Sequence, residues 1–316
     1  AVGGAINLIT KTAPGIPTAQ IGYQMDHSGY GRVQFSAGAQ LGKKWSVMTG
    51  GYVARQKGAW ASNSDFDKSS INLRLDYQFT PKTKLWSSFA YNNYYSQTGG
   101  NIDSTGFYSR SYQSPADFTY RASFSSRARL TLEHQWTMHA NSSLTAFYRD
   151  NVLGQNPAYS ISWSAPSLTA SGQVNQNSFK SFGVMGQHNH SFEFLNSKLV
   201  AGFLLDRSPN DYWAYKINLS ATLRPDKKSV EKFTISQVMP SVFLGNYSAI
   251  IWNKAAYAQV DVHPFEKLRV SFGGRFDQMS FDYSNLIDKS TGSKSYAQFS
   301  PKFGITYAAS SNVGFY

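Results

Sequence analysis

The chain has 316 residues, a formal net charge of +12 and no cysteine, and its mean hydropathy is -0.38. No stretch approaches the roughly 18 apolar residues of a membrane-spanning helix, so a helical membrane protein is excluded. The lack of cysteine excludes disulfide bonds and thiolate metal sites. Aromatic residues make up 16% of the chain, which is typical of strands that alternate apolar and polar side chains, either in a membrane barrel or in a large soluble β-protein.

The excess of positive charge does not indicate a nucleic-acid partner. Lys and Arg occur singly along predicted strands, and the sequence contains no recognition-helix or RNA-binding motif. We interpret the basic residues as charge that lines a lumen and outer loops, where it would attract anionic cargo or anionic lipid headgroups.

The first ten residues predict a short buried strand, because Gly3 and Gly4 precede an alternation of side chains over residues 5–10. Residues 14–17, Pro-Gly-Ile-Pro, break this pattern as a linker would. From residue 18 onward the chain predicts strands of about ten residues or more, close to the length of a tilted membrane-spanning strand. These strands are 18–27, 32–42, 45–55, 69–80, 84–96, 120–138, 143–152, 178–194, 198–207, one containing 256–263, one starting at 268, 297–308 and a thirteenth starting at 310.

Strand 69–80 has the clearest alternation. Its odd-numbered positions from Ile71 to Phe79 are apolar, and its even-numbered positions from Asn72 to Gln78 are polar. One face of this strand is therefore expected to be dry and the other wet. No segment of the chain has a convincing helical periodicity.

The predicted connections alternate between short turns and longer loops. A soluble β-sandwich has no reason to keep all its short turns on one side, whereas outer-membrane barrels pair short periplasmic turns with longer extracellular loops. The alternation of short turns with longer loops therefore favours a membrane barrel. The short turns are 42–44, 80–83, 139–142, 195–197, 264–267 and 309–312, and the longest loops are 97–118, 153–177 and 208–247.

Three segments resemble TonB-dependent outer-membrane receptors and occur in that family's order. Residues 3–11, Gly-Gly-Ala-Ile-Asn-Leu-Ile-Thr-Lys, resemble the last strand of the family's plug domain. Residues 256–277 look like its mid-barrel hairpin, most of all in iron-transport members, and residues 299–307 resemble the strand that follows. Together the three motifs span almost the whole chain.

The resemblance implies an all-β fold, an antiparallel transmembrane β-barrel that is part of a 22-stranded barrel and is preceded by the last strand of a plug domain. Residues 1–13 would then be the C-terminal end of the plug, 14–17 a linker, and 18–316 an incomplete barrel of about twelve strands and the start of a thirteenth. Because unpaired backbone groups in lipid are costly, we expect the sequence to be an internal segment of a larger receptor.

The resemblance also implies a function. A receptor of this family, in the outer membrane of a Gram-negative-type cell, would capture a scarce nutrient at its extracellular loops, most often a ferric siderophore, and import it into the periplasm with inner-membrane energy. Expected partners are the TonB complex, outer-membrane lipid, lipopolysaccharide and the small-molecule cargo, and no cofactor is implied. Carbohydrate, haem or cobalamin receptors of the same family, and a passive porin or structural barrel, are the alternatives.

Cargo recognition is expected on the long connections, where aromatic and basic residues gather. Many of these aromatic residues would instead belong to the interfacial girdle of a barrel. Arg110 and Lys216 lie near aromatic residues and would suit an anionic ferric chelate. The candidate ligand-binding residues are Trp60, Tyr94, Tyr95, Tyr108, Arg110, Tyr112, Tyr159, Trp163, Tyr212, Trp213, Tyr215 and Lys216.

No catalytic constellation is present, so the chain is not expected to be an enzyme. His188 and His190 share one strand face at a spacing that could bind a metal, but the phenylalanines on that face favour an interfacial role, and no metal site is predicted. The carboxylates on the predicted strands are interpreted as lumen charges beside Arg74, Arg129 and Arg275. These carboxylates are Asp76, Glu133, Asp261 and Asp277.

Overall fold

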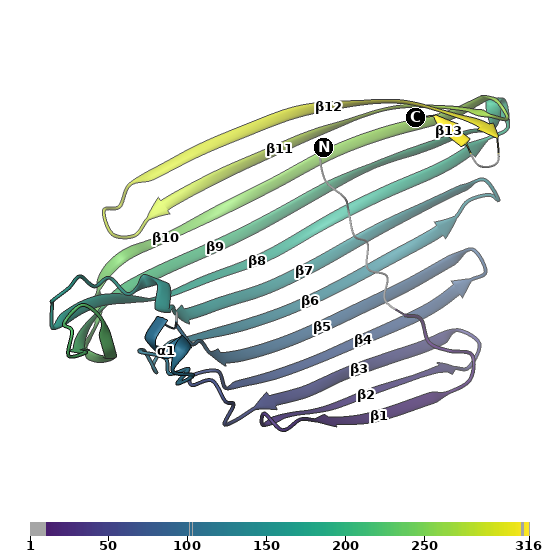
Figure 1. The fold of residues 1–316 in the computed structure, drawn as a ribbon. Helices are drawn as coiled ribbons and strands as arrows, with labels where there is room; N and C mark the ends of the chain where they lie inside the picture. The colour runs from purple at the N-terminus through teal and green to yellow at the C-terminus, as the bar shows by residue number, and fades with distance from the viewer. Residues whose placement is uncertain (1–10, 101, 103, 311–312, 316) are drawn as a thin grey trace.

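The structure is a computed structural model that describes residues 11–100, 102, 104–310 and 313–315. Its strands follow one another around a single curved antiparallel sheet, each hydrogen-bonded to its neighbours in sequence (Figure 1). Among the described residues, no helix is long and apolar enough to cross a membrane. The elements are β1 (Thr18–Met25), β2 (Tyr30–Leu41), β3 (Trp45–Gln56), β4 (Phe66–Thr80), β5 (Thr83–Gln97), α1 (Ser104–Tyr108), β6 (Tyr120–Gln135), β7 (Ala140–Asn156), β8 (Thr169–Phe192), β9 (Ser197–Leu223), β10 (Val230–Phe265), β11 (Leu268–Asn285), β12 (Thr291–Ser310) and β13 (Val313–Phe315), with single turns of 3-10 helix at Ala158–Ser160 and Phe194–Asn196.

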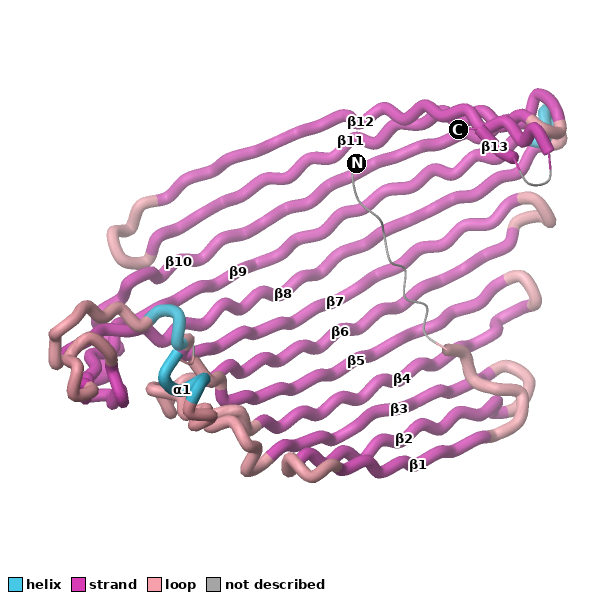
Figure 2. The backbone as a smooth tube through the Cα atoms, viewed as in Figure 1, coloured by secondary structure: helices cyan, strands magenta, loops and turns pink. Residues whose placement is uncertain are grey.

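The all-β antiparallel fold predicted from the sequence is confirmed, as is the alternation of connections. The connections that follow β2, β4, β6, β8 and β10 are short and gather at one end of the sheet, which we call the short-turn end (Figure 2). The connections that follow β3, β5 and β7 are longer and lie at the opposite end, together with α1. We call this the long-connection end.

Two of the expected loops are largely strands. Residues 208–247, predicted as the longest loop, form the outer part of a hairpin in which β9 continues to Leu223 and β10 begins at Val230. The loop predicted at 153–177 is shorter, because β7 extends to Asn156 and β8 begins at Thr169. In the extension of β9 the odd-numbered positions from Tyr215 to Leu223 are apolar and the even-numbered ones are polar, so the period of two that marks a strand is present there and the loop prediction overlooked it.

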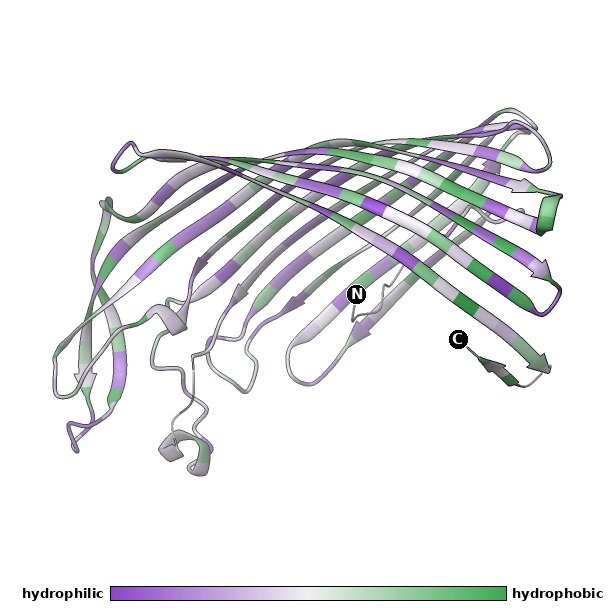
Figure 3. Cartoon of the chain, turned by 90° about the horizontal axis from the view of Figure 1, so that it is seen from above, coloured by the Kyte–Doolittle hydropathy of each residue, from purple (hydrophilic) through white to green (hydrophobic). Residues whose placement is uncertain are grey.

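Each strand separates two kinds of surface, and Figure 3 shows apolar and polar residues alternating along the sheet. Ile71 and Leu75 of β4 are 41% and 36% exposed on one face, while Arg74 and Asp76 lie on the other. The apolar face continues on the neighbouring strand β5, where Phe89 is directly opposite Leu73. We call the two surfaces the lipid face and the lumen face.

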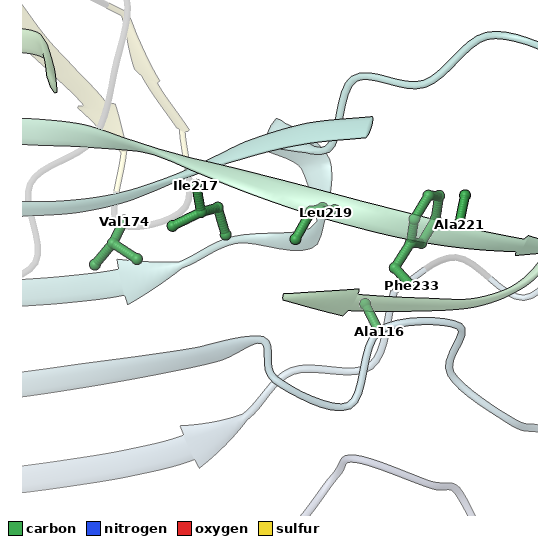
Figure 4. Close-up of a cluster of buried hydrophobic side chains, with 6 residues drawn as sticks. All are labelled: Ala116, Val174, Ile217, Leu219, Ala221 and Phe233. Atoms are coloured by element: carbon green, nitrogen blue, oxygen red, sulfur yellow. The ribbon is translucent and has the colours of Figure 1, made fainter. Parts of the chain in front are cut away.

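A buried apolar cluster lies at the long-connection end (Figure 4). It joins β8, β9 and the start of β10 to the connection between β5 and β6. The backbone N–H of Phe233 donates to Pro115 O at 2.7 Å, and Lys232 Nζ lies 3.0 Å from Asp117 Oδ2. The cluster consists of Ala116, Val174, Ile217, Leu219, Ala221 and Phe233.

The strand predicted at residues 5–10 lies outside the described residues. The assignment of residues 1–13 to the end of a plug domain and of 14–17 to a linker therefore stays a prediction.

Candidate functional site

Asn63, in the connection between β3 and β4, holds the connections of the long-connection end together. Its Nδ2 lies 3.0 Å from the carbonyl oxygens of Thr98 and Ala116, 3.2 Å from Thr119 O and 3.0 Å from Thr119 Oγ1. Carbonyl oxygens only accept hydrogen bonds, so this environment fixes the amide with its nitrogen inward. Residues 57–65 and 98–119, far apart in sequence, are thereby joined into one scaffold.

A cavity of about 430 Å³ opens against this scaffold. Its walls come from the connection between β5 and β6 with the start of β6, from the end of β7 with the connection that follows it, and from Phe233 of β10. It is of the size that small-molecule sites occupy in proteins. The lining residues are Thr98, Gly99, Gly100, Pro115, Ala116, Tyr120, Arg121, Gln155, Pro157, Ala158, Tyr159, Ile161, Trp163 and Phe233.

Gln155, at the end of β7, orders the polar wall of the cavity. Its Nε2 donates to the hydroxyl of Tyr159 at 2.9 Å and to Asn175 Oδ1 at 3.2 Å. Its Oε1 accepts from Arg121 Nε at 3.3 Å. Because Gln155 is only 9% exposed, these bonds hold it in one orientation and hold the Arg121 guanidinium at the cavity wall.

Arg121 gives the cavity its charge. None of the lining residues is acidic, and within the described chain the two NH2 groups of Arg121 have no ion-pair partner. Tyr120, Tyr159 and Trp163 line the same cavity. A cavity lined by a planar guanidinium and by aromatic rings suits an anionic, partly aromatic ligand.

The pKa of the Tyr120 phenol is raised above its ordinary value by burial and, to a smaller extent, by the neighbouring phenols Tyr215 and Tyr95. The hydroxyl therefore stays protonated at neutral pH. It can donate a hydrogen bond to an anionic ligand in the cavity.

Two of the twelve predicted site residues, Tyr159 and Trp163, line this cavity. The Trp163 indole N–H donates to Ser167 O at 2.7 Å, which fixes the ring. Trp163 also borders a second hollow of about 570 Å³, and Lys216 lies on that hollow. These three residues are therefore close neighbours at the long-connection end.

The other candidates lie around the scaffold in pairs. Trp60 meets Tyr112 edge-on with ring centroids 5.0 Å apart, and Tyr95 stacks on Tyr120 at 5.7 Å. Trp213 stacks on Tyr215 at 5.5 Å beside the apolar cluster, and Tyr212 stacks on Tyr247 at 5.1 Å. Tyr94 lies under Lys68 Nζ, 4.7 Å from its ring centroid. Tyr108 and Arg110 are exposed and do not line the cavity.

Sequence reasoning missed Arg121, Gln155 and Phe233. Arg121 lies in a predicted strand, whereas Gln155 and Phe233 lie in predicted loops from which only aromatic residues with a polar group and basic residues were selected. The sequence could have indicated Arg121, because it is separated from Arg127 and Arg129 by even numbers of residues and therefore lies on the same face of β6.

The lumen face below the cavity carries further arginines. Arg74 Cζ and Arg129 Cζ lie 4.7 Å and 5.3 Å from the ring centroid of Trp86. Glu133 was expected to lie beside arginine, and it instead accepts a hydrogen bond from Trp86 Nε1 at 2.7 Å. Trp86 thus stands between cations and an anion on one wall of the lumen.

The remaining strand carboxylates are paired with arginines. Arg275 Nη2 lies 2.7 Å from Asp277 Oδ1, and Arg269 Nη2 lies 2.8 Å from Asp261 Oδ2. Asp76 is paired with Arg74. The pairs on the lumen face therefore agree with the interpretation of these carboxylates as structural charges.

His188 and His190 lie near the short-turn end of β8. His188 Nδ1 is 2.8 Å from Ser142 Oγ, and His190 stacks on Phe192 with centroids 4.2 Å apart. Among the described residues, no group of three or more His, Cys, Asp or Glu side chains is placed to hold a metal ion. Aromatic stacking at this level is typical of a membrane-interface belt.

The fold is that of an outer-membrane receptor barrel. Residues 234–316 match the family model described as TonB dependent receptor-like, beta-barrel. This match and the sheet confirm the resemblance to TonB-dependent receptors and the outer-membrane localisation expected from it. No curated protein is significantly similar in sequence to this chain.

Solved structures extend the likeness of fold over nearly the whole chain. The ferric citrate transporter FecA in its unliganded form is 12% identical, with a TM-score of 0.75 over 98% of this chain and 45% of FecA. The ferripyoverdine receptor of the Pseudomonas aeruginosa outer membrane is 16% identical, with a TM-score of 0.76 over 97% and 42%. The ferric-catecholate import receptor Fiu of E. coli K12, open form, is 12% identical, with a TM-score of 0.72 over 96% and 54%. The chain therefore spans about half the length of these structures.

Proposed function

We propose that this chain forms part of a TonB-dependent receptor that binds an anionic ferric siderophore at the long-connection end and imports it across the outer membrane. The observation that carries the proposal is the cavity that combines Arg121 with Tyr120, Tyr159 and Trp163, on a sheet of the receptor-barrel fold. The solved structures of similar fold include receptors for ferric citrate, ferric catecholate and ferripyoverdine.

Charge along the lumen face supports an anionic cargo. Arg127 and Arg129 follow Arg121 on the same face of β6, and within the described residues neither forms an ion pair with a carboxylate. Cations lining a confined path raise the local concentration of anions. We infer that the cargo moves along this wall, that TonB supplies the energy for release, and that the protein performs no catalysis.

The binding test uses the complete receptor purified from outer membranes. Quenching of tryptophan fluorescence is measured with an anionic ferric tricatecholate, a neutral ferric hydroxamate, haem, cobalamin and an oligosaccharide. We expect the anionic chelate to bind most tightly, and Arg121→Gln to weaken it about tenfold or more, because a charge-assisted contact is lost. The matched control is Arg55→Gln, an exposed arginine that does not line the cavity, which should bind as the unchanged receptor does.

Uptake of radioactive iron by whole cells tests the transport step. A protonophore should abolish uptake of the bound chelate if TonB transmits the energy. Iron starvation should also raise the abundance of the receptor in outer membranes. Uptake that persists with the protonophore would indicate a passive pore, and preferential binding of oligosaccharide would overturn the ferric cargo.

A further inference from the structure

Two cations on the lipid face lie against one indole ring. Arg207 Cζ is 6.0 Å and Lys254 Nζ is 5.8 Å from the ring centroid of Trp252. In the ladder of β9 and β10, Trp252 is opposite Arg207 and Lys254 is opposite Leu205. Leu205 and Phe203 are 47% and 41% exposed on that same face. The two positive charges therefore stand at the border of an apolar surface.

No carboxylate of the described chain neutralises these cations. Arg207 and Lys254 are both exposed, and neither has an ion-pair partner among the described residues. The adjacent Asp206 lies on the lumen face, where it pairs with Arg149 at 2.5 Å. The lipid-face carboxylates nearest in register belong to Asp150, Asp211 and Asp282. Asp150 is opposite Lys180 on the far side of β8, Asp211 is four residues along β9, and Asp282 of β11 is opposite Ile250, where Ser293 Oγ donates to it at 2.7 Å.

The height of Arg207 and Lys254 above the short-turn end of the sheet follows from strand geometry. Arg207 lies about ten residues from the short-turn end of β9, and Lys254 about eleven from that of β10. At about 3.3 Å per residue and a tilt of about 40°, ten residues rise about 25 Å, which is the height of the apolar band of a membrane barrel. Arg207, Lys254 and Trp252 are therefore level with the headgroups on the side of the long connections.

The geometry points to a binding site for the phosphate groups of lipopolysaccharide, formed by Arg207, Lys254 and Trp252. A guanidinium can hold a phosphate through two parallel hydrogen bonds, an ammonium adds a second charge, and the indole sits at the headgroup level. Lys180 of β8, diagonal to Arg207 on the same face, supplies a third cation. Three cations on adjacent strands match a headgroup with more than one phosphate better than a singly charged phospholipid.

This inference rests on the proposed function only for the orientation of the barrel, with its long connections outward. Cargo would bind on the lumen side and at the long-connection end, whereas these residues face lipid. Loss of lipid binding with normal cargo binding, or the reverse, therefore distinguishes a failure of one proposal from a failure of the other.

The test uses the complete receptor extracted in mild detergent. Native mass spectrometry counts the lipopolysaccharide molecules retained by the unchanged receptor, by the double variant Arg207→Gln with Lys254→Gln, and by the control Arg275→Gln, which removes a cation from the lumen face of the neighbouring strand. Retention by the double variant should fall about tenfold or more, while the control should retain lipopolysaccharide as the unchanged receptor does. Heat-dependent migration on gels confirms that each variant is folded.

Delipidated receptor is then offered lipopolysaccharide, its enzymatically dephosphorylated form, or phosphatidylglycerol. Only the phosphorylated glycolipid should rebind at substoichiometric concentration. Unchanged retention by the double variant, equal loss in the control, or equal binding of the dephosphorylated lipid would overturn the site. Equal binding of phosphatidylglycerol would overturn its assignment to lipopolysaccharide.

Discussion

Arg74 and Asp76 stand two residues apart on the lumen face of β4 and form a buried ion pair. Arg74 Nη2 lies 3.0 Å from Asp76 Oδ1, and the two side chains are only 10% and 8% exposed. Lys84 Nζ of the next strand lies 3.3 Å from the same carboxylate oxygen. One carboxylate thus neutralises two cations near the short-turn end of the sheet.

We predict that Asp76→Asn lowers the stability of the receptor by about 3 kcal/mol, because removing one partner leaves the other charges buried and uncompensated. The matched control is Asp277→Asn. Its pair with Arg275 is as close, at 2.7 Å, but the side chains are 44% and 46% exposed, so the loss should be below about 1 kcal/mol. Thermal unfolding in detergent measures both, and equal losses would contradict the assignment of burial as the cause.

The sheet could be predicted where lipid and water lie on opposite sides of a strand. In β4 this asymmetry imposes a period of two from Ile71 to Phe79, and the predicted strand differs from the observed one only at its start. The outer part of β9 was predicted to be a loop, although Ile217, Leu219 and Ala221 alternate with polar residues there. The connection between β5 and β6 and the start of β10 cover these side chains, and such contacts between distant segments are not specified by the local pattern.

The candidate site was less predictable, because it is made by contacts between distant segments. Tyr159 and Trp163 could be selected as aromatic residues on a long connection. The role of Gln155 depends on bonds to Arg121 and Asn175, which no local pattern encodes. The cavity exists only once the connections after β5 and β7 meet the start of β10.

Asn63→Ala should loosen the long-connection end without unfolding the sheet. The variant removes the Nδ2 contacts to Thr98, Ala116 and Thr119, a loss of about 2 kcal/mol at about 1 kcal/mol per net hydrogen bond. Hydrogen exchange should rise in residues 98–119. Ser64→Ala, which removes one local bond to Ala61 O, is the matched control and should leave that exchange nearly unchanged. The prediction fails if both variants exchange alike.

Phe233→Ala should loosen the hairpin of β9 and β10 close to its turn. Phe233 is 8% exposed within the apolar cluster, so truncation removes apolar contacts and leaves a cavity, at a cost of about 3 kcal/mol. The control is Ile235→Ala on the same strand, where the side chain is 39% exposed and the cost should be near 1 kcal/mol. Limited proteolysis should cut residues 224–229 faster only in Phe233→Ala, and faster cutting in both would argue against the cluster as the anchor.

The turn between β9 and β10 should weaken in acid because of Asp226. The backbone N–H of Lys228 donates to Asp226 Oδ1 at 2.9 Å, and that of Ser229 at 3.3 Å. The Lys228 N–H, together with the hydrogen bonds from Ser229, lowers the pKa of the carboxyl below its ordinary value. Because the pKa of Asp226 is lower in the folded turn than in the unfolded chain, the ionised carboxylate stabilises the turn. This stabilisation is complete above the ordinary pKa of an aspartate and is lost as the pH falls through the lowered pKa of the folded turn.

Hydrogen exchange of residues 224–229, corrected for the intrinsic rate at each pH, measures this effect. Protection should be lower at about pH 2 than at about pH 6, because the neutral acid accepts backbone hydrogen bonds more weakly than the carboxylate. Asp226→Asn keeps an acceptor oxygen without the charge, so its protection should be reduced at both pH values and differ little between them. A drop of the same size in Asp226→Asn would assign the acid sensitivity to another group of the hairpin.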